Sequence, residues 1–481
     1  MNTRRFSPEI RQVILDALPK ETSLFERTPD IKYTYFPTSH AKALHPDSML
    51  VVGIRGAGKS YWWSALQKED HRMLIETTLP QTKITRDSFI SKGFGENPSP
   101  EDYPGKDVLV SLLSKFDARQ IWRSIVLFHL LKQGEISNPL SKLSEWKDRV
   151  GWVHENPEKV ERFAFNADVK LEKSERYHLI LFDALDRTAD NWPFMFKLVR
   201  GLFQVLLEFR SYKRIRPKAF VRPDHLEDPS VMDFPDASKV FTQNVELSWP
   251  RNELYGLLWQ YLANEPNKGK LFRDGCRIKF DKRDNVWIIP EGLRNNEETQ
   301  RKVFNKITGP WMGRDRRRGF PYTWLPNHLG DTRRQVSPRS FLAALRYAAD
   351  DNPRPDYEYA LHYESIKRGV QEASKIRVSE MKEDYPWVDS LMKPLSGLTV
   401  PCFFEDIAGK WQQEGTLKQL KSASVKLPPA HLEAGDFGIR KDLEALGLFE
   451  RMSDDRVNLP DVYRVGYGIG RRGGVRAVAR K

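Results

Sequence analysis

The chain has few cysteines and no long apolar run. Only two of its 481 residues are cysteines, and neither Cys276 nor Cys402 has a cysteine or histidine at metal-ligand spacing. This fits a reducing cytoplasm and argues against a zinc module. The most apolar stretch, 108–131, is broken by charged side chains, so no uninterrupted run approaches the roughly 18 residues of a membrane span. Residues 1–9 lack the apolar core of a signal peptide. We therefore expect a globular cytoplasmic protein without a membrane partner.

Acidic residues are too few to balance the basic ones. The sequence has 78 lysines and arginines against 65 aspartates and glutamates, a net charge of +13. The excess gathers in three places, which are Arg210, Lys213, Arg214, Arg216 and Lys218; Arg314, Arg316, Arg317 and Arg318; and the tail 464–481, with Arg471, Arg472, Arg476, Arg480 and Lys481. Glycines in the tail predict a flexible segment that tracks a phosphate backbone. The equal alternative is a tail docked on an acidic face of its own protein or of a partner. The charge favours a polyanionic partner, with nucleic acid as the first candidate.

Residues 50–60 carry the clearest motif of the chain. Gly53, Gly58, Lys59 and Ser60 match the phosphate-binding pattern G-x-x-x-x-G-K-[ST]. An apolar run precedes the motif and a helical pattern follows it, so a strand, a glycine-rich turn and a helix N-terminus should form an anion site. We expect Lys59 to face the β- and γ-phosphates of ATP, and Ser60 to ligate Mg²⁺. The expected nucleotide-binding residues are Gly53, Arg55, Gly56, Ala57, Gly58, Lys59, Ser60 and Tyr61.

A second motif, which carries acidic residues, adds a carboxylate to the phosphate loop. The apolar run 177–182 ends in Asp183, which predicts a Mg²⁺ ligand at the end of a strand. Many hydrolysing NTPases place a second acid directly after the first, but this chain has Ala184 there. Asp186 is the nearest substitute, although it could equally cap a helix or pair with Arg187. This departure predicts slow or partner-activated hydrolysis.

Strand and helix patterns alternate along residues 46–264. Further strands are expected at 72–76, 217–222 and 245–249, helices at 108–133, 192–212 and 252–264, a loop at 91–104, and inserted short helices at 138–176. Such alternation predicts an α/β fold, a P-loop NTPase core with a mainly parallel sheet between helices. Ligands bind at the carboxyl ends of such strands, so the phosphate loop, Asp183 and Arg222 should border one crevice.

The rest of the chain is predicted to be largely helical. A small β element is expected near 280–289 and a helix at 340–349, while 441–460 resembles the helix and β turn of a winged helix. The predicted parts are an N-terminal segment (1–45), a P-loop ATPase core (46–250) with an insertion at about 80–175, a helical lid (251–350) with an insertion at about 265–326, and a helical, winged-helix-like C-terminal domain with a basic tail (351–481).

Together these motifs resemble the AAA+/STAND-like P-loop ATPases of bacteria, a branch that includes KAP-type and phage-defence ATPases. The resemblance rests on residues 53–60, the strand 179–183 followed by Asp186 and Arg187, the strand-end Arg222, the strand and helix at 245–262, and residues 330–333 before a helix. It implies that Arg222 is a sensor-1 arginine that reads the γ-phosphate. It also implies that Arg333 or Arg339 is a sensor-2 arginine on the lid. The alternatives are that Arg222 only caps its strand and that Arg339 is a surface charge.

The resemblance implies an ATPase that uses ATP and Mg²⁺. Its expected catalytic residues are Lys59, Asp183, Asp186 and Arg222, and its expected metal ligands are Ser60 and Asp183. By this analogy the nucleotide state controls assembly with a protein partner, a second copy of the chain or nucleic acid, in antiviral defence. Two alternatives stay open. One is a DNA-transacting ATPase of the replication-initiation or transposition-regulator type, and the other is a scaffold that binds ATP without turnover.

Overall fold

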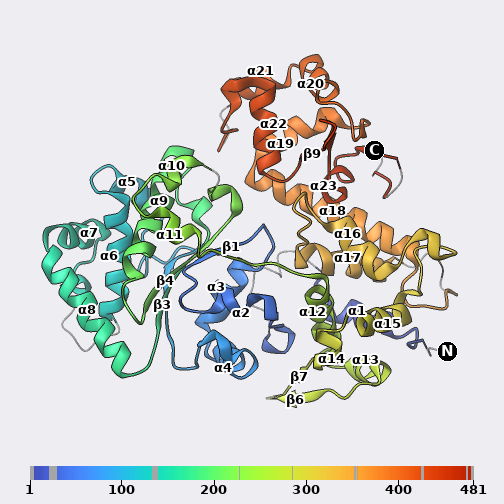
Figure 1. Cartoon of the computed structure of the whole chain (residues 1–481), viewed down its shortest axis with the longest axis horizontal. Helices are drawn as coiled ribbons and strands as arrows, with labels where there is room; N and C mark the ends of the chain where they lie inside the picture. The colour runs from blue at the N-terminus through green and yellow to red at the C-terminus, as the bar shows by residue number, and fades with distance from the viewer. Residues whose placement is uncertain are drawn as a thin grey trace. The chain divides into compact units, whose positions relative to one another are not determined.

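The chain folds into two compact units (Figure 1). Unit 1 combines Met1–Pro37 with Trp249–Lys481, and unit 2 is Thr38–Ser248. The computed structural model describes residues 5–20, 30–132, 139–226, 228–283, 285–351, 354, 356–423, 427–472 and 475–477. Among these residues, no helix is both long enough and apolar enough to cross a bilayer.

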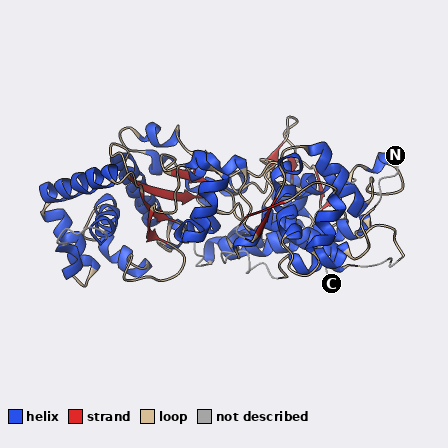
Figure 2. Cartoon of the chain, turned by 90° about the horizontal axis from the view of Figure 1, so that it is seen from below, coloured by secondary structure: helices blue, strands red, loops and turns tan. Residues whose placement is uncertain are grey.

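Unit 2 is built on a five-stranded sheet in the order β2-β3-β4-β1-β5. The strands are β1 (Leu50–Val52), β2 (Phe89–Phe94), β3 (His178–Phe182), β4 (Ile215–Val221) and β5 (Val245–Glu246). All neighbouring strands run parallel. Figure 2 shows these strands enclosed by helices. The predicted α/β fold with a mainly parallel sheet is confirmed.

The central strands are buried because helices cover the sheet. Strand β1 and residues 179–182 of β3 are continuous apolar runs, whereas β4 includes Arg216 and Lys218. Every residue of β1, β3 and β4 is buried. The register pairs Phe182 with Ala219, and Val52 with Val221. The carboxyl ends of β3, β4 and β1 therefore lie together at one edge of the sheet.

Helices of unit 2 fill the connections between these strands. They are α2 (Ala41–Leu44), α3 (Lys59–Gln67), α4 (Glu69–Thr78), α5 (Lys106–Leu113), α6 (Ala118–Lys132), α7 (Trp146–Glu155), α8 (Pro157–Lys173), α9 (Trp192–Phe209), α10 (Pro229–Met232) and α11 (Ala237–Phe241). Helix α3 contacts β2 and β4, whereas α6 and α9 contact each other and the sheet. The Trp63 indole on α3 also donates to the Leu181 carbonyl of β3 at 3.2 Å.

Three sequence-based assignments in unit 2 are wrong. Residues 72–76 are not a strand but part of α4, whose buried side chains His71, Leu74 and Ile75 have helical spacing. Strand β2 extends into the segment predicted as a loop. It was missed because it includes Gly93, where a Cβ atom would lie 2.5 Å from the Phe182 ring. The single helix expected at 108–133 is two helices, α5 and α6, separated by a short break.

Unit 1 is mainly helical. Its helices before the C-terminal part are α1 (Ile10–Ala17), α12 (Arg251–Ala263), α13 (Gly269–Cys276), α14 (Glu291–Arg294), α15 (Glu297–Thr308), α16 (Pro321–Leu329), α17 (Pro338–Asp350), α18 (Tyr363–Asp384) and α19 (Pro386–Met392). A hairpin of β6 (Asp281–Arg283) and β7 (Val286–Ile288) forms the expected small β element. One hydrophobic core joins α1, α12 and α17, and fully buried Phe272 and Phe304 come from the predicted insertion.

The C-terminal part of unit 1 has a winged-helix order of elements. Helices α20 (Phe404–Gln413), α21 (Thr416–Ser422) and α22 (Gly435–Ala445) precede an antiparallel pair, β9 (Glu450–Arg451) and β10 (Val457–Asn458). Cys402, just before α20, forms an antiparallel bridge with Val457. After a short helix, α23 (Asp461–Arg464), strand β11 (Gly470–Arg471) pairs parallel with β8 (Thr399–Val400). This part therefore matches the predicted helix, turn and strand.

Candidate nucleotide site

The phosphate loop leaves β1 and bends sharply before α3. The Gly53 N–H donates to the Val221 carbonyl at 3.0 Å, which continues the pairing with β4. Gly56 and Gly58 have φ angles of 77° and 102°. Glycine adopts this left-handed region without the steric cost that a side chain adds. Helix α3 begins directly afterwards at Lys59, so the loop closes around a helix N-terminus.

Lys59 points back into the loop. Its ammonium donates to the Gly53 carbonyl at 2.7 Å and to the Ile54 carbonyl at 3.0 Å. Burial lowers the pKa of Lys59 to about 8, against the opposing attraction of Asp183. A half-buried cation held by backbone carbonyls at a helix N-terminus fits a phosphate partner, because phosphate would supply the missing negative charge.

Asp183 lies directly after β3 and is buried. Its carboxylate accepts hydrogen bonds from the Ser60 hydroxyl and from the Ala184 N–H. Burial raises the pKa of Asp183, although Ser60 and Lys59 oppose that rise. A hydroxyl and a carboxylate in contact are oxygen ligands of the kind that Mg²⁺ prefers. The two predicted metal ligands therefore meet.

Ala184 turns the chain away from the strand. Its φ of 55° lies in the left-handed region, which costs a residue with a Cβ atom about 1–2 kcal/mol. The 3₁₀ turn Leu185–Arg187 follows and carries Asp186. Arg187 pairs with Glu96 rather than with Asp186, so the structure does not show the predicted ion pair between Asp186 and Arg187. The left-handed backbone at Ala184 is the kind of local strain that is characteristic of functional turns.

Strand β4 lies between β1 and β3 and ends beside Arg222. The Arg222 guanidinium makes a two-point contact with Asp224, with Nε to Oδ1 at 3.1 Å and Nη2 to Oδ2 at 3.0 Å. Its Nη1 lies 3.8 Å from Oδ2 of Asp186. Burial raises the pKa of Asp186, but Arg222, His225 and a backbone hydrogen bond together outweigh this effect and lower the pKa below its usual value. Because Lys59 also interacts with Asp183, Asp186 and Arg222, the four predicted catalytic residues form one cluster.

Asp224 and His225 also belong to this cluster, although neither was predicted from the sequence. Asp224 holds Arg222, and the His225 ring is buried with neither nitrogen hydrogen-bonded to a described residue. Burial lowers the pKa of His225. Their position directly after Arg222-Pro223 was the available signal, because residues that follow a strand end share its edge of the sheet.

The remaining predicted loop residues have mixed surroundings. Ala57 is buried, and its N–H donates to the Ile54 carbonyl at 3.1 Å. Tyr61 packs edge-on against the buried Trp62, with ring centroids 5.1 Å apart. Arg55 is partly exposed within the loop. The nucleotide-binding roles of Arg55, Ala57 and Tyr61 stay predictions.

The two candidate sensor-2 arginines belong to unit 1. Arg339 is no free surface charge, because its Nη1 lies 2.6 Å from Oε1 of the buried Glu380 on α18. The Arg333 N–H donates to the Asp331 carboxylate at 2.9 Å in a turn before α17. A sensor-2 role for either residue remains a prediction.

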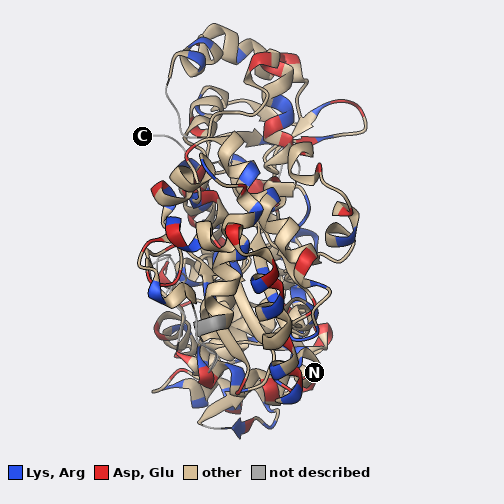
Figure 3. Cartoon of the chain, turned by 90° about the vertical axis from the view of Figure 1, so that its left-hand side faces the viewer, with Lys and Arg blue, Asp and Glu red and all other residues tan. Residues whose placement is uncertain are grey.

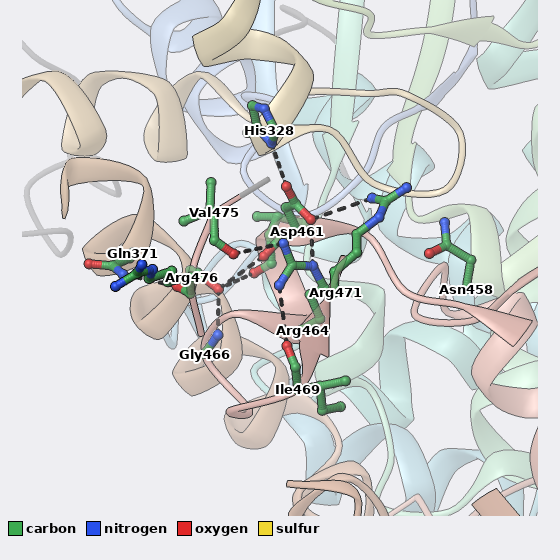
Figure 4. Close-up of polar contacts among 12 residues, drawn as sticks. His328, Gln371, Asn458, Asp461, Arg464, Gly466, Ile469, Arg471, Val475 and Arg476 are labelled. Carbon is green, nitrogen blue, oxygen red and sulfur yellow. Dashed lines mark hydrogen bonds and ion pairs between the residues drawn. The ribbon is translucent and has the colours of Figure 1, made fainter. Parts of the chain in front are cut away.

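The basic tail is not a flexible arm over its described residues. Arg464 is fully buried; its Nε donates to Asp461 Oδ1 at 2.5 Å and its Nη2 to the Val475 carbonyl at 2.9 Å (Figure 4). Arg471 lies 3.6 Å from the same carboxylate, and His328 contacts its other oxygen. Asp461 thus supplies the acid that the tail itself lacks.

Backbone pairing fixes the tail further. β11 pairs with β8, and the Arg476 carbonyl accepts a hydrogen bond from the Gln371 amide at 2.9 Å. The predicted flexible tail is therefore wrong for residues 464–472 and 475–477, and docking on the protein's own acidic group is the better description. Gly473, Gly474 and residues 478–481, with Arg480 and Lys481, lie outside the described residues.

The first basic cluster is also engaged internally. The Lys218 ammonium is fully buried and donates to the Ala43 carbonyl at 2.8 Å and the His45 carbonyl at 2.9 Å. Arg216 pairs with Asp47 at 2.8 Å, and Lys213 with Glu172 at 2.6 Å. Burial lowers the pKa of Lys218 to about 7. Residues 210–218 therefore do not form one open polyanion surface, and Figure 3 shows basic and acidic positions interspersed along the chain.

Comparison with known proteins adds little to this geometry. No family model matches the chain, and no curated protein matches it. Among solved structures, Cdc6p from Pyrobaculum aerophilum matches at 10% identity and a TM-score of 0.29, over 93% of this chain and 95% of that chain. The Orc2 protein from Aeropyrum pernix, solved as ADPNP–ADP complexes, matches at 12% identity and a TM-score of 0.30, over 90% and 93%. TM-scores of this size do not establish a shared fold, so the function rests on the site itself.

Proposed function

We propose that this chain is an AAA+-type P-loop ATPase that binds ATP with Mg²⁺ at the carboxyl edge of the sheet in unit 2. One observation carries the proposal. Three adjacent parallel strands bring these residues to one edge: Lys59 and Ser60 follow β1, Asp183 and Asp186 follow β3, and Arg222 follows β4. Phosphoryl transfer requires cations that bind the phosphates, oxygen ligands that bind a metal, and an arginine beside a carboxylate.

The chain's own residues divide this work. The N-terminus of α3 and Lys59 would hold the phosphates, while Ser60 and Asp183 would hold Mg²⁺, which neutralises phosphate charge when bound. Asp186 does not stand directly after Asp183, where the second acid usually lies. Its lowered pKa, to which Arg222 and His225 contribute, would keep it ionised and able to orient a water. Arg222, fixed by Asp224, would respond to the terminal phosphate.

The direct test is phosphate release by the purified full chain with ATP, in the presence and absence of Mg²⁺. We expect slow, Mg²⁺-dependent turnover that disappears in Lys59→Ala. ATP binding of ordinary affinity with no turnover, alone or with nucleic acid, would instead support the scaffold function. No ATP binding at all would contradict the proposal.

A second candidate function is a DNA-transacting ATPase, whose nucleotide state governs engagement of nucleic acid. The winged-helix order of residues 402–458 favours it over a purely protein-directed ATPase. DNA-stimulated phosphate release, with binding that weakens steeply as salt rises, would support it. No feature of the described residues speaks for antiviral defence, and that function is not proposed.

A further inference from the structure

The loop between α15 and α16 in unit 1 is an ordered, strongly basic segment. It spans residues 309–320, and its base is closed by a hydrogen bond from the Met312 N–H to the Gly319 carbonyl at 2.8 Å. The Met312 side chain is buried in the hydrophobic core. Gly309 and Gly319, with φ angles of 77° and 89°, make the bends at either end. The loop is therefore held in a defined shape by backbone and core contacts.

This loop presents exposed arginines to solvent. Arg314, Arg316, Arg317 and Arg318 are all exposed, and none forms an ion pair with a carboxylate of the described chain. The neighbouring acid, Asp315, accepts a hydrogen bond from the Arg317 N–H at 2.9 Å and caps the turn Arg316–Arg318. The contrast with Lys213, Arg216 and Lys218, which are buried or paired with a carboxylate, is direct. The second basic cluster of the sequence is the one that stays available.

Two aromatic side chains flank these arginines. Trp311 and Phe320 are each 38% exposed, a high value for such large apolar rings. The Arg301 guanidinium, from the exposed face of α15, lies 5.9 Å from the Phe320 ring centroid. Aromatic rings beside arginines allow two kinds of contact with nucleic acid, because rings stack on bases and guanidinium groups bind phosphates.

We propose that loop 309–320 binds single-stranded nucleic acid. Guanidinium groups bind phosphate oxygens through paired hydrogen bonds, and their charge releases counterions from the strand. The exposed rings favour a single strand over a duplex, because base faces in a duplex are already stacked and hidden. An acidic protein would also use the charges, so poly-glutamate serves as the competing ligand in the test below. This inference does not depend on the nucleotide site of unit 2.

The test measures fluorescence anisotropy of a labelled single-stranded DNA of about 20 nucleotides with the full chain, and of a duplex of the same sequence. Titrations at roughly 50 and 200 mM salt give the salt slope. We expect tighter binding of the single strand. If the four arginines contact phosphates, they contribute about −2.8 to the slope of log affinity against log salt.

Variants then assign the binding to the loop. Arg316→Ala/Arg317→Ala should weaken single-strand binding at least about tenfold and flatten the slope by about 1.4. The charge-matched control Lys270→Ala/Lys279→Ala removes two exposed lysines of the same unit and should leave both values unchanged. Trp311→Ala should weaken binding roughly tenfold without changing the slope, because stacking carries no charge.

Three results would overturn the proposal. The first is equal loss in the loop variant and the lysine control, which would show a general charge effect. The second is equal affinity for duplex and single strand with no effect of Trp311→Ala, which would show a phosphate site without stacking. The third is equal binding of poly-glutamate, which would show an acidic-protein site. ATP affinity and melting temperature of the variants should match the unsubstituted chain, so a failure of the ATPase proposal would be seen separately.

Discussion

The Ser60 hydroxyl donates a hydrogen bond to the buried carboxylate of Asp183. These residues are far apart in the chain, one in the first turn of α3 and the other after β3, and β4 separates their strands. The contact joins the phosphate loop to the strand end that carries Asp183. A Mg²⁺ site needs the hydroxyl oxygen and the carboxylate oxygen close together in this way.

Lys59→Ala should weaken ATP binding at least about tenfold, or about 1.4 kcal/mol. Lys59 is the cation that the motif fixes beside the phosphates, and its ammonium now faces loop carbonyls. Calorimetry of ATP binding measures the effect. Lys68→Ala, an exposed lysine at the other end of α3, is the control and should bind ATP normally. Unchanged affinity in Lys59→Ala would show that the loop is not the site.

Asp183→Asn should slow Mg²⁺-dependent hydrolysis at least roughly tenfold while changing ATP affinity less. The amide keeps the shape and can still accept from Ser60, but it loses the charge that holds the metal. Because burial raises the pKa of Asp183, removing its charge should not lower the melting temperature measured without nucleotide. A collapsed melting temperature would mean that Asp183 is needed chiefly for folding.

Arg222→Ala should reduce turnover at least about tenfold at saturating ATP, because its guanidinium stands beside Asp186 at the strand end. Asp224→Asn should reduce turnover less, since Arg222 keeps its charge but loses its two-point support. Steady-state phosphate release at several ATP concentrations separates kcat from KM. Arg210→Ala, an exposed arginine of the same unit, serves as control. Equal kcat values for Arg222→Ala and this control would rule out the sensor role.

The stability of unit 2 should fall in mild acid because of His40. Burial lowers the pKa of His40 from 6.5 to about 3. Its Nδ1 accepts from the Trp62 indole at 3.0 Å, and its Nε2 contacts the Ser248 carbonyl at 3.0 Å, so the folded ring is neutral. Between pH 6.5 and about 3 the unfolded chain binds a proton that the folded chain excludes. The unfolding free energy should therefore drop as pH falls, by up to about 1.4 kcal/mol per unit.

Urea unfolding at a series of pH values measures this dependence. His40→Asn is expected to be less stable at neutral pH but to show a shallower loss in acid. His154→Asn, an exposed histidine, should keep the full slope. Equal slopes for His40→Asn and the unsubstituted chain would refute the assignment. His178, whose pKa burial also lowers to about 3, adds a similar contribution.

Arg464→Met should lower the unfolding free energy of unit 1 by about 3–5 kcal/mol, because it leaves the buried Asp461 carboxylate with fewer partners. Thermal and urea unfolding measure the loss. Arg472→Ala, an exposed tail arginine, should have no such effect. If Arg464→Met were as stable as this control, the tail would not be anchored through Asp461.

Local sequence patterns were enough to predict the parts of the nucleotide site. The glycine spacing of residues 53–60 dictates a tight turn wherever it occurs, and the apolar run before Asp183 dictates a buried strand with a carboxylate at its end. The hairpin near 280–289 and the helix–strand pattern after 441 were equally local. These features depend on steric limits and hydrophobic periodicity within a few residues, so they can be predicted without the tertiary structure.

Tertiary structure alone decided which charges are available and which elements are neighbours. Arg464 and Lys218 look like surface cations in the sequence, yet both are fully buried. Lys218 is surrounded by the backbone carbonyls of the distant residues Ala43 and His45. Arg464 pairs with the nearby Asp461, whose carboxylate also contacts His328 of α16. The order of strands places β4, and with it Arg222, between β1 and β3. Helix α1 joins the core of the C-terminal half across more than two hundred intervening residues. Contacts between segments far apart in the chain leave no periodic pattern in the sequence, because they depend on which buried surfaces fit each other rather than on local spacing.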